Sequence, residues 1–256
     1  MKSVITEALI LRTNDYGESD RIVRFMSPGL GKVSGIAKGA RKSIKRFGGC
    51  LEPFTLVSLT VQPREGLSLI KEGAAAKGYK GIKNDLERFA YGSYLLDLTN
   101  NIVADDLDDE SEKVFFLLKN ALALLEASDK PEEVVREYEV RLLGITGYMP
   151  SFLNCLSCGD PVDRPMDEAG QGGPVEAVFS PGDGGVFCRN CGSEKAGLES
   201  ISIGTLKTLE AVSTKKVSFS RNAIEESGRI IPPFIMHHLG RRLKSLEFID
   251  KMKGGV

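Results

Sequence analysis

Two Cys-x-x-Cys pairs constrain the fold of this chain more than any other feature of its sequence. The first pair is Cys155 and Cys158, the second is Cys188 and Cys191, and 29 residues lie between the two pairs. Two such turns can place four thiolates at the corners of a tetrahedron, the arrangement of structural Zn²⁺ sites with Zn–S distances of about 2.3 Å. A glycine follows each pair, and it suits a tight turn that aims backbone amides at sulfur. We therefore predict one structural zinc ion per chain, bound by these four cysteines.

A closed set of four thiolates argues against catalysis by this metal. Catalytic zinc sites keep an open position and generally have three protein ligands. The zinc deaminases also require an H-x-E motif, which is absent here, and the only histidines are His237 and His238. We expect the metal to stabilise a segment too rich in glycine and proline to fold alone. The fifth cysteine, Cys50, is expected to be a small buried apolar residue.

The first 80 residues show the alternation typical of short strands. The clearest stretch is 57–61, where Val and Leu alternate with Ser and Thr, as in a strand with one buried face. Five strands are expected, at Val4–Leu11, Arg21–Phe25, Val33–Ala37, Leu56–Val61 and Leu67–Lys71. Five short strands suit a small closed barrel, and the OB-fold is a five-stranded barrel that binds oligonucleotides. An SH3-like barrel has nearly the same pattern and stays open as an alternative.

Helical periodicity replaces alternation after Gly81. Helices are expected at Asp85–Val103, Asp109–Ala127, Pro131–Gly144, Ile203–Ser213 and Pro233–Met252, with Pro232 and Pro233 at the entry to the last. The predicted fold class is α+β. It comprises a five-stranded OB-fold barrel over residues 1–80, an α-helical domain over 81–153 and 197–256, and an inserted four-cysteine zinc knuckle over 154–196.

A strip of cations lies between Gly31 and Phe47. It contains no acidic residue and six cations, namely Lys32, Lys38, Arg41, Lys42, Lys45 and Arg46. A run of charges is often only a solvated loop, but cations beside barrel strands favour a polyanion such as nucleic acid. Arg12, Arg21 and Arg24 can extend this surface. Tyr16, Phe25 and Phe47 are candidate platforms for stacked bases, although alternation with Val23 also places Phe25 in the core.

An acidic cluster separates two of the expected helices. It consists of Asp105, Asp106, Asp108, Asp109 and Glu110. Clustered carboxylates can bind Mg²⁺ for phosphoryl chemistry, and a metal-dependent nuclease is therefore one alternative. Capping of the following helix explains the same residues more simply.

Several functional classes find no support in the sequence. There is no G-x-x-x-x-G-K-[ST] phosphate loop and no G-x-S-x-G nucleophile motif. We therefore do not expect an enzyme.

The sequence also indicates the compartment of the protein. No run of 18 apolar residues and no signal-peptide core occur, and paired Cys-x-x-Cys motifs are typical of a reducing compartment. We expect a cytoplasmic protein that does not bind membranes.

The chain resembles the RecO family of bacterial recombination mediators over essentially its whole length. The resemblance rests on the opening EALILRTNDYGESDRIVRFMSPGLGKVSGIAKGARK, the LEPF step at residues 51–54 and the closing LGRRLKSLEFI. It implies an OB-fold first domain and the binding of single-stranded and double-stranded DNA. It also implies annealing of strands coated with single-strand binding protein, and cooperation with RecR in loading RecA, in association with the nucleoid.

The resemblance also assigns roles to residues. It supports Lys38, Arg41 and Lys42 as DNA contacts, and the four paired cysteines as zinc ligands. Not every family member has these cysteines, which fits a structural role for the metal. For the acidic tail of single-strand binding protein, the basic residues Arg241, Arg242 and Lys244 are the candidates. An RNA-binding zinc-ribbon factor would share the barrel and the strip, and it is the remaining alternative.

Overall fold

The structure is a computed structural model that describes residues 2–105, 110–163, 176–193 and 195–254. The chain forms two compact units, one of Met1–Val134 with Leu243–Val256 and the other of Val135–Arg242. None of the described helices has the length and apolar character needed to cross a membrane.

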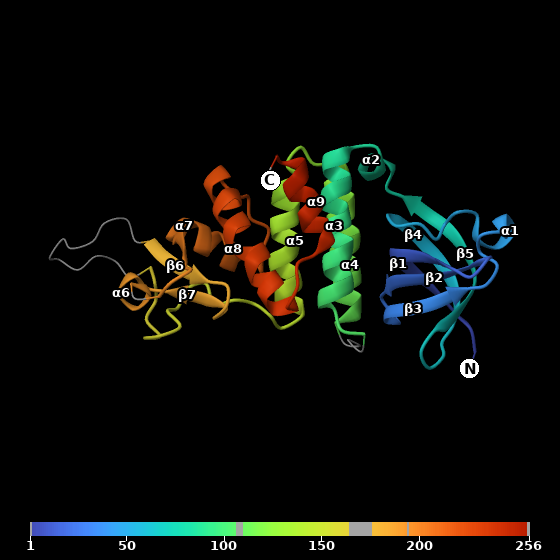
Figure 1. Ribbon diagram of the computed structural model, residues 1–256, viewed down its shortest axis with the longest axis horizontal. Coiled ribbons are helices and arrows are strands. Elements are labelled where there is room, and N and C mark those ends of the chain that lie inside the picture. Colours follow the sequence, from blue (N-terminus) through green and yellow to red (C-terminus); the bar gives the residue numbers. More distant parts are fainter. Residues whose placement is uncertain (1, 106–109, 164–175, 194, 255–256) are drawn as a thin grey trace. The chain divides into compact units, whose positions relative to one another are not determined.

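A closed five-stranded barrel opens the first unit (Figure 1). Its strands are β1 (Val4–Tyr16), β2 (Asp20–Ser27), β3 (Gly31–Ala37), β4 (Thr55–Gln62) and β5 (Ser68–Gly78). The order around the barrel is β1-β2-β3-β5-β4, and β3 and β5 are parallel whereas the other pairs are antiparallel. The short helix α1 (Ile44–Phe47) lies between β3 and β4 in the chain. This is the OB-fold, and the prediction of a five-stranded barrel is confirmed over its SH3-like alternative.

Strand β1 closes the barrel because it pairs along two edges. Its first half pairs with β4, from Val4 opposite Val61 onward, and its second half pairs with β2 as far as Tyr16 opposite Asp20. A shift in register between Ile10 and Arg12 bends the strand between these partners. The barrel core is built by alternate residues of the strands with Phe47, Cys50 and Leu51 from the α1 region. Cys50 is 2% exposed, as expected for a small apolar residue.

Four helices complete the first unit. They are α2 (Lys80–Lys83), α3 (Leu86–Ile102), α4 (Ser111–Ala127) and α9 (Lys244–Met252). Helix α3 begins at the N-cap Asp85, whose carboxylate accepts a hydrogen bond from the Arg88 N–H at 2.8 Å. The expected start of the next helix at Asp109 lies outside the described residues.

Gly92 of α3 allows the ring of Phe54 to approach the helix backbone. A Cβ at this position would lie 2.8 Å from Phe54 Cε1 and 2.9 Å from Ile82 Cγ2. Both neighbours are buried, so neither can move freely. We expect Gly92→Ala to destabilise the protein by about 1–3 kcal/mol through overpacking, measured by chemical denaturation. Gly228→Ala is the control, because a Cβ there meets no atom within 4 Å and alanine favours the helix. An equal loss in both variants would contradict this account.

The second unit contains the remaining helices and a small sheet. Its elements are α5 (Pro131–Ile145, which begins in the first unit), β6 (Glu176–Ser180), β7 (Gly185–Phe187), α6 (Arg189–Gly192), β8 (Glu199–Ser202), α7 (Ile203–Val212) and α8 (Arg221–Leu239). The sheet order is β7-β6-β8. The expected helices at 131–144 and 203–213 are confirmed to within one residue.

The expected helix Pro233–Met252 is wrong. Pro232 and Pro233 lie inside α8 (Arg221–Leu239), which begins eleven residues before Pro232, directly after the N-cap Ser220, and ends before the C-cap Gly240. Ser220 accepts a hydrogen bond from the Ala223 N–H, and Gly240 has the left-handed conformation (φ 63°) that stops a helix. A separate helix, α9, follows from Lys244. The caps, rather than the prolines, therefore set the helix boundaries.

Candidate metal centre and nucleic-acid interface

The four paired cysteines form a cluster in the second unit. Their Sγ atoms all lie within 4.8 Å of one another, and Cys158 Sγ and Cys188 Sγ are 3.9 Å apart. A tetrahedron with 2.3 Å metal–sulfur bonds has edges of about 3.8 Å. The spacing of the sulfurs therefore fits a tetrahedral metal ion, and the described residues around them supply only thiol ligands.

Backbone turns position the sulfurs of both pairs. The Gly159 N–H donates to Cys155 O at 2.9 Å, and the Gly192 N–H donates to Cys188 O at 2.9 Å. Gly159 has φ 78°, a conformation that favours glycine. At Gly192 the reason for glycine is space, because a Cβ would lie 2.3 Å from Val178 Cγ2. The two glycines therefore serve the same site for different physical reasons.

Strand β7 brings the two turns together. The Leu156 N–H of the first turn donates to Val186 O in β7 at 2.9 Å, and Cys188 follows directly after that strand. The 29 residues between the pairs thus provide the hairpin that joins them. Cys155 is buried, Cys158 is exposed, and Cys188 and Cys191 are intermediate.

The cluster favours thiolate at its buried member. Burial raises the pKa of Cys155, but hydrogen bonds from the backbone at Cys158, Cys188 and Ser157 outweigh it and lower the pKa to about 6. The hydrogen bond with the Cys188 thiol raises the pKa of Cys191 to about 12. Thiols that ligate a cation are deprotonated, so metal binding would release the protons shared by these sulfurs.

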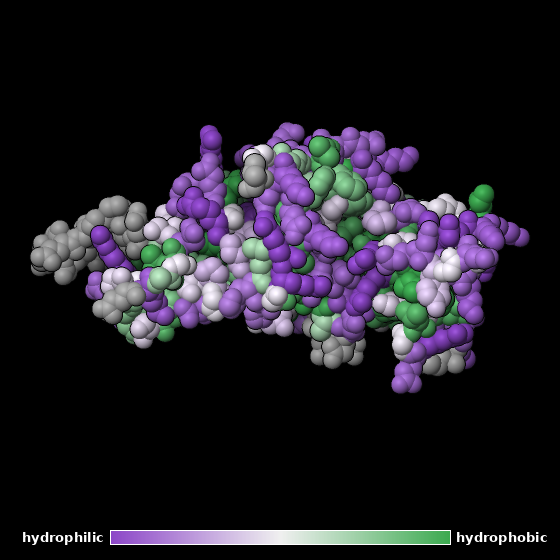
Figure 2. Space-filling model, in the orientation of Figure 1, coloured by the Kyte–Doolittle hydropathy of each residue, from purple (hydrophilic) through white to green (hydrophobic). Residues whose placement is uncertain are grey.

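The basic strip of the barrel is exposed over most of its length. The segment between β3 and β4 folds into a turn and helix α1, and Arg46 Nη2 donates to Lys38 O at 2.8 Å across it. Its exposed cations are Lys38, Arg41, Lys42, Lys45 and Arg46. Within the described part of the chain, no carboxylate forms an ion pair with Lys38, Lys42 or Lys45. Figure 2 shows mainly hydrophilic side chains over the barrel, with small apolar patches between them.

Acidic groups fix two of the arginines on the barrel surface. Arg21 is paired with Asp15 (Nε–Oδ1 3.2 Å) and with Glu52 (Nη1–Oε1 2.6 Å). The other oxygen of Asp15 lies 3.4 Å from Arg41 Nε. Hydrogen bonding to Glu52 raises the pKa of Arg21, so its positive charge is permanent. These pairs hold Arg21 beside Arg41 of the strip but neutralise part of the charge of both arginines.

Lys32 does not belong to the exposed surface, which corrects its placement in the strip. Its side chain is 5% exposed, and its Nζ donates to the carbonyls of Asn100 (2.8 Å) and Val103 and lies 3.1 Å from Asp105. Desolvation lowers the pKa of Lys32, whereas Asp105 opposes this shift. Lys32 therefore fastens β3 to the C-terminal end of α3, and we exclude it from the proposed interface.

Lys32→Met is expected to lower stability by about 2–4 kcal/mol, because the buried Val103 carbonyl and the part-buried Asn100 carbonyl lose their donor and Asp105 loses a cation. Thermal or urea unfolding measures this change. Affinity for single-stranded DNA should stay within twofold of wild type. Lys42→Met is the matched control and should leave stability unchanged, because Lys42 is exposed. A DNA-binding defect in Lys32→Met without loss of stability would restore Lys32 to the interface.

The other candidates from the sequence have different surroundings. Arg24 is paired with Asp105, and Arg12 is exposed, its Nε donating to Asn14 Oδ1 at 3.3 Å. Phe25 and Phe47 are 0% and 2% exposed, so neither can stack on a base. Tyr16 is the one of the three candidate rings that is exposed, at 55%.

The acidic cluster shows no free pair of carboxylates in its described part. Asp105 is occupied by Lys32 and Arg24, and Glu110 is paired with Lys113 at 2.8 Å. The other three acids, Asp106, Asp108 and Asp109, lie outside the described residues.

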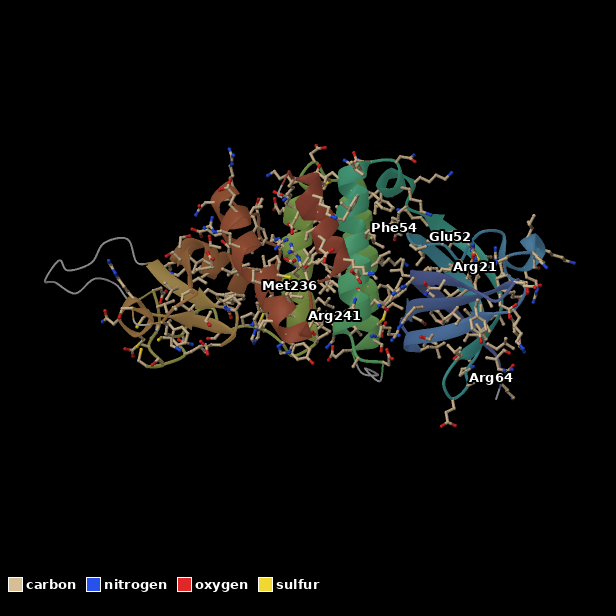
Figure 3. The ribbon with its side chains drawn as sticks, viewed as in Figure 1. Arg21, Glu52, Phe54, Arg64, Met236 and Arg241 are labelled. Atoms are coloured by element: carbon tan, nitrogen blue, oxygen red, sulfur yellow. The ribbon has the colours of Figure 1, made fainter. Side chains whose placement is uncertain are left out.

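The carboxy-terminal cations are exposed. Arg241 and Arg242 follow the C-cap Gly240 of α8, and Lys244 is the first residue of α9. Figure 3 labels Arg241. Sequence reasoning missed a further exposed cation, Arg64, in the loop between β4 and β5. Because the acid Glu65 follows it directly, Arg64 is not part of an acid-free run of cations.

An OB-fold barrel with an exposed strip of cations, joined in the chain to helices and a four-cysteine cluster, is an arrangement typical of nucleic-acid-binding proteins that contain a structural metal. Comparison with known families gives the particular group. Residues 1–79 match the family described as Recombination protein O N terminal, and residues 83–247 match Recombination protein O C terminal. The chain belongs to the RecO family of DNA repair proteins.

Similar curated proteins cover the chain almost completely. The DNA repair protein RecO of Syntrophus aciditrophicus is 34% identical over 97% of this chain and 95% of its own length. The protein of the same name from Geobacter sulfurreducens is 34% identical over 98% of this chain and 99% of its own length. The one from Nocardioides is 28% identical over 96% and 98%. Family membership supports a role in DNA repair and recombination.

Proposed function

We propose that this protein is a recombination mediator that binds single-stranded and double-stranded DNA through the barrel. In this role it anneals complementary strands coated with single-strand binding protein, and with RecR it promotes the loading of RecA. It works without catalysing bond chemistry, in the cytoplasm and at the nucleoid during repair. The observation that carries this proposal is the exposed, acid-free strip of Lys38, Arg41, Lys42, Lys45 and Arg46 on an OB-fold of the RecO family.

The charges of the strip suggest how annealing would proceed. Two DNA strands repel each other through their phosphates, and cations that neutralise phosphates reduce this repulsion and release counterions. Lys38, Lys42 and Lys45 form no ion pair with a described carboxylate, so their charge is available to phosphate. Binding would then require no nucleotide hydrolysis.

We infer that the metal of the four-cysteine cluster is zinc with a structural role. Four thiolates in tetrahedral arrangement are typical of structural zinc sites, and no ligand position remains open for a substrate. Partner binding by Arg241, Arg242 and Lys244, directed at the acidic tail of single-strand binding protein, is also part of the proposal. Their support is exposure and positive charge alone.

The test of the proposed function is annealing of complementary oligonucleotides coated with single-strand binding protein. The reaction is followed by fluorescence energy transfer, without nucleotide and at several salt concentrations. We expect acceleration by this protein that fades as salt increases, because the interaction with phosphate is electrostatic. Tight binding of single strands without any acceleration would contradict the mediator role, and preference for RNA in competition would replace it by an RNA-binding function.

A further inference from the structure

A pocket of about 470 Å³ lies between one side of the barrel and helix α3, within the first unit. This volume is in the range of about 300–1,000 Å³ that is usual for small-molecule sites. Its apolar wall includes Leu11, Pro53, Phe54 and Phe89. The basic strip, at 38–46, contributes no residue to the pocket, so the pocket is a separate feature of the barrel.

Two aromatic rings form part of the wall. Phe54 and Phe89 meet edge to face, with ring centroids 5.5 Å apart. Phe54 is 3% exposed, whereas Phe89 is 39% exposed and offers a ring to an incoming group. Phe54 also has φ 61°, a left-handed conformation that is strained in a residue other than glycine. Gly92 of α3 leaves the space that the ring of Phe54 occupies.

The pocket offers positive charge that is not used within the unit. Arg12 and Lys83 line it and are exposed, and neither forms an ion pair with a described carboxylate. The two acids of the lining already have partners. Glu52 is neutralised by its ion pair with Arg21, whereas the partner of Asp97 Oδ2 is the neutral Ser245 Oγ at 2.8 Å, so two cations of the lining face one acid without a described counter-ion. An apolar or aromatic group that carries an anion therefore complements this pocket.

Ion pairs connect the pocket wall to the basic strip. Glu52 of the wall is bound to Arg21, Arg21 to Asp15, and Asp15 to Arg41 of the strip. Figure 3 shows Phe54, Glu52 and Arg21 following one another from the α3 side into the barrel. A strand whose phosphates lie on the strip can therefore continue toward the pocket over this row of side chains.

We propose that the pocket receives one nucleotide of the bound single strand, with its base against Phe89 and its phosphates near Arg12 and Lys83. This inference rests on the proposed DNA-binding function. Stacking on aromatic rings is tolerant of sequence because every base has a π-face. An acidic peptide with an apolar residue shares this chemistry, but continuity with the strip favours the nucleotide. The pocket would give the protein a contact that duplex DNA, with its bases stacked, cannot make.

The first test compares a dT oligonucleotide with an abasic oligonucleotide of the same length, bound to the full chain and measured by fluorescence anisotropy. We expect wild type to prefer the dT strand, and Phe89→Leu to weaken dT binding about five- to tenfold without changing abasic binding. A five- to tenfold loss corresponds to about 1.0–1.4 kcal/mol, as expected when one base loses its aromatic platform. The matched control is Phe116→Leu, the same change at an exposed ring of α4 that does not line the pocket.

A second variant and a cross-link make the result independent of folding. Ser93→Phe should fill the pocket from α3 and lower only dT binding, with melting measured in parallel. A strand containing 5-iodouracil should cross-link wild type within the tryptic peptide that begins at Phe89. Three results would overturn the proposal. The variants could lose affinity equally for both oligonucleotides, or wild type could give no cross-link in that peptide. An acidic peptide could also displace the dT strand from wild type but not from Phe89→Leu. Failure of wild type to bind either oligonucleotide would instead refute the proposed function.

Discussion

Cys155→Ser is expected to lose its bound metal and to melt about 10 °C or more below wild type. A structural metal contributes its binding energy to folding. We estimate a loss of about 3–5 kcal/mol, at roughly 2–4 °C per kcal/mol for a chain of this size. Metal content by mass spectrometry and melting by differential scanning fluorimetry measure the two effects. Cys155 is chosen among the four ligands because it is buried and because backbone hydrogen bonds lower its pKa to about 6, which favours the thiolate that binds metal.

Cys50→Ala is the control for this prediction. It also removes a buried thiol, but Cys50 lies in the barrel core and not in the cluster. This variant should therefore keep one metal ion per chain, even if the small cavity lowers its melting temperature. Full metal content and unchanged melting in Cys155→Ser would refute the ligand assignment.

The second large effect is expected from reversing two charges of the strip. Lys38→Glu together with Lys42→Glu should weaken binding of single-stranded DNA about 10- to 100-fold at moderate salt. If wild type contacts about six phosphates, log K against log salt has a slope near roughly −4, and loss of two contacts reduces it by about 1.4. Anisotropy titrations at several salt concentrations measure both quantities. These lysines are preferred to Arg41, because Arg41 is already paired with Asp15.

The matched control reverses the same charge elsewhere. Lys215→Glu together with Lys216→Glu changes an exposed pair that follows α7 and lies outside the strip. It should leave the salt slope unchanged, and melting of both double variants should stay within a few degrees of wild type. Equal affinity in the two double variants would show that the strip is only a solvated loop.

Local patterns explain which parts of the fold could be predicted. Strand β4 alternates from Val57 to Gln62, where each buried apolar residue is followed by a more exposed polar one, and patterns of this kind predicted the positions of all five strands. The strands extend further than expected at their polar ends, since β1 continues to Tyr16 through exposed residues whose backbone pairs with β2. Hydrogen bonding, unlike burial, leaves no periodic signal in a sequence.

Other features depend on contacts between distant residues. In the sequence, Lys32 does not differ from the other cations of the strip. Its side chain points inward because its Nζ donates to carbonyls at the end of α3, about 70 positions later in the chain. The pocket likewise joins residues of β1, the segment before β4 and α3. The helix start predicted at Pro232 and Pro233 was wrong for another reason. Pro232 is buried within α8, and packing of its ring offsets the loss of backbone hydrogen bonds.

The buried amine of Lys32 has a consequence for how the molecule can be divided. The family boundaries fall between residues 79 and 83, which suggests that the barrel is a removable module. A fragment ending there would leave the ammonium group of Lys32 facing the cut surface, without the two carbonyls and the carboxylate that now surround it. The side of the barrel that α3 covers would become exposed to water at the same time. We therefore expect the barrel and α3 to fold only together, although two sequence families divide the chain between residues 79 and 83.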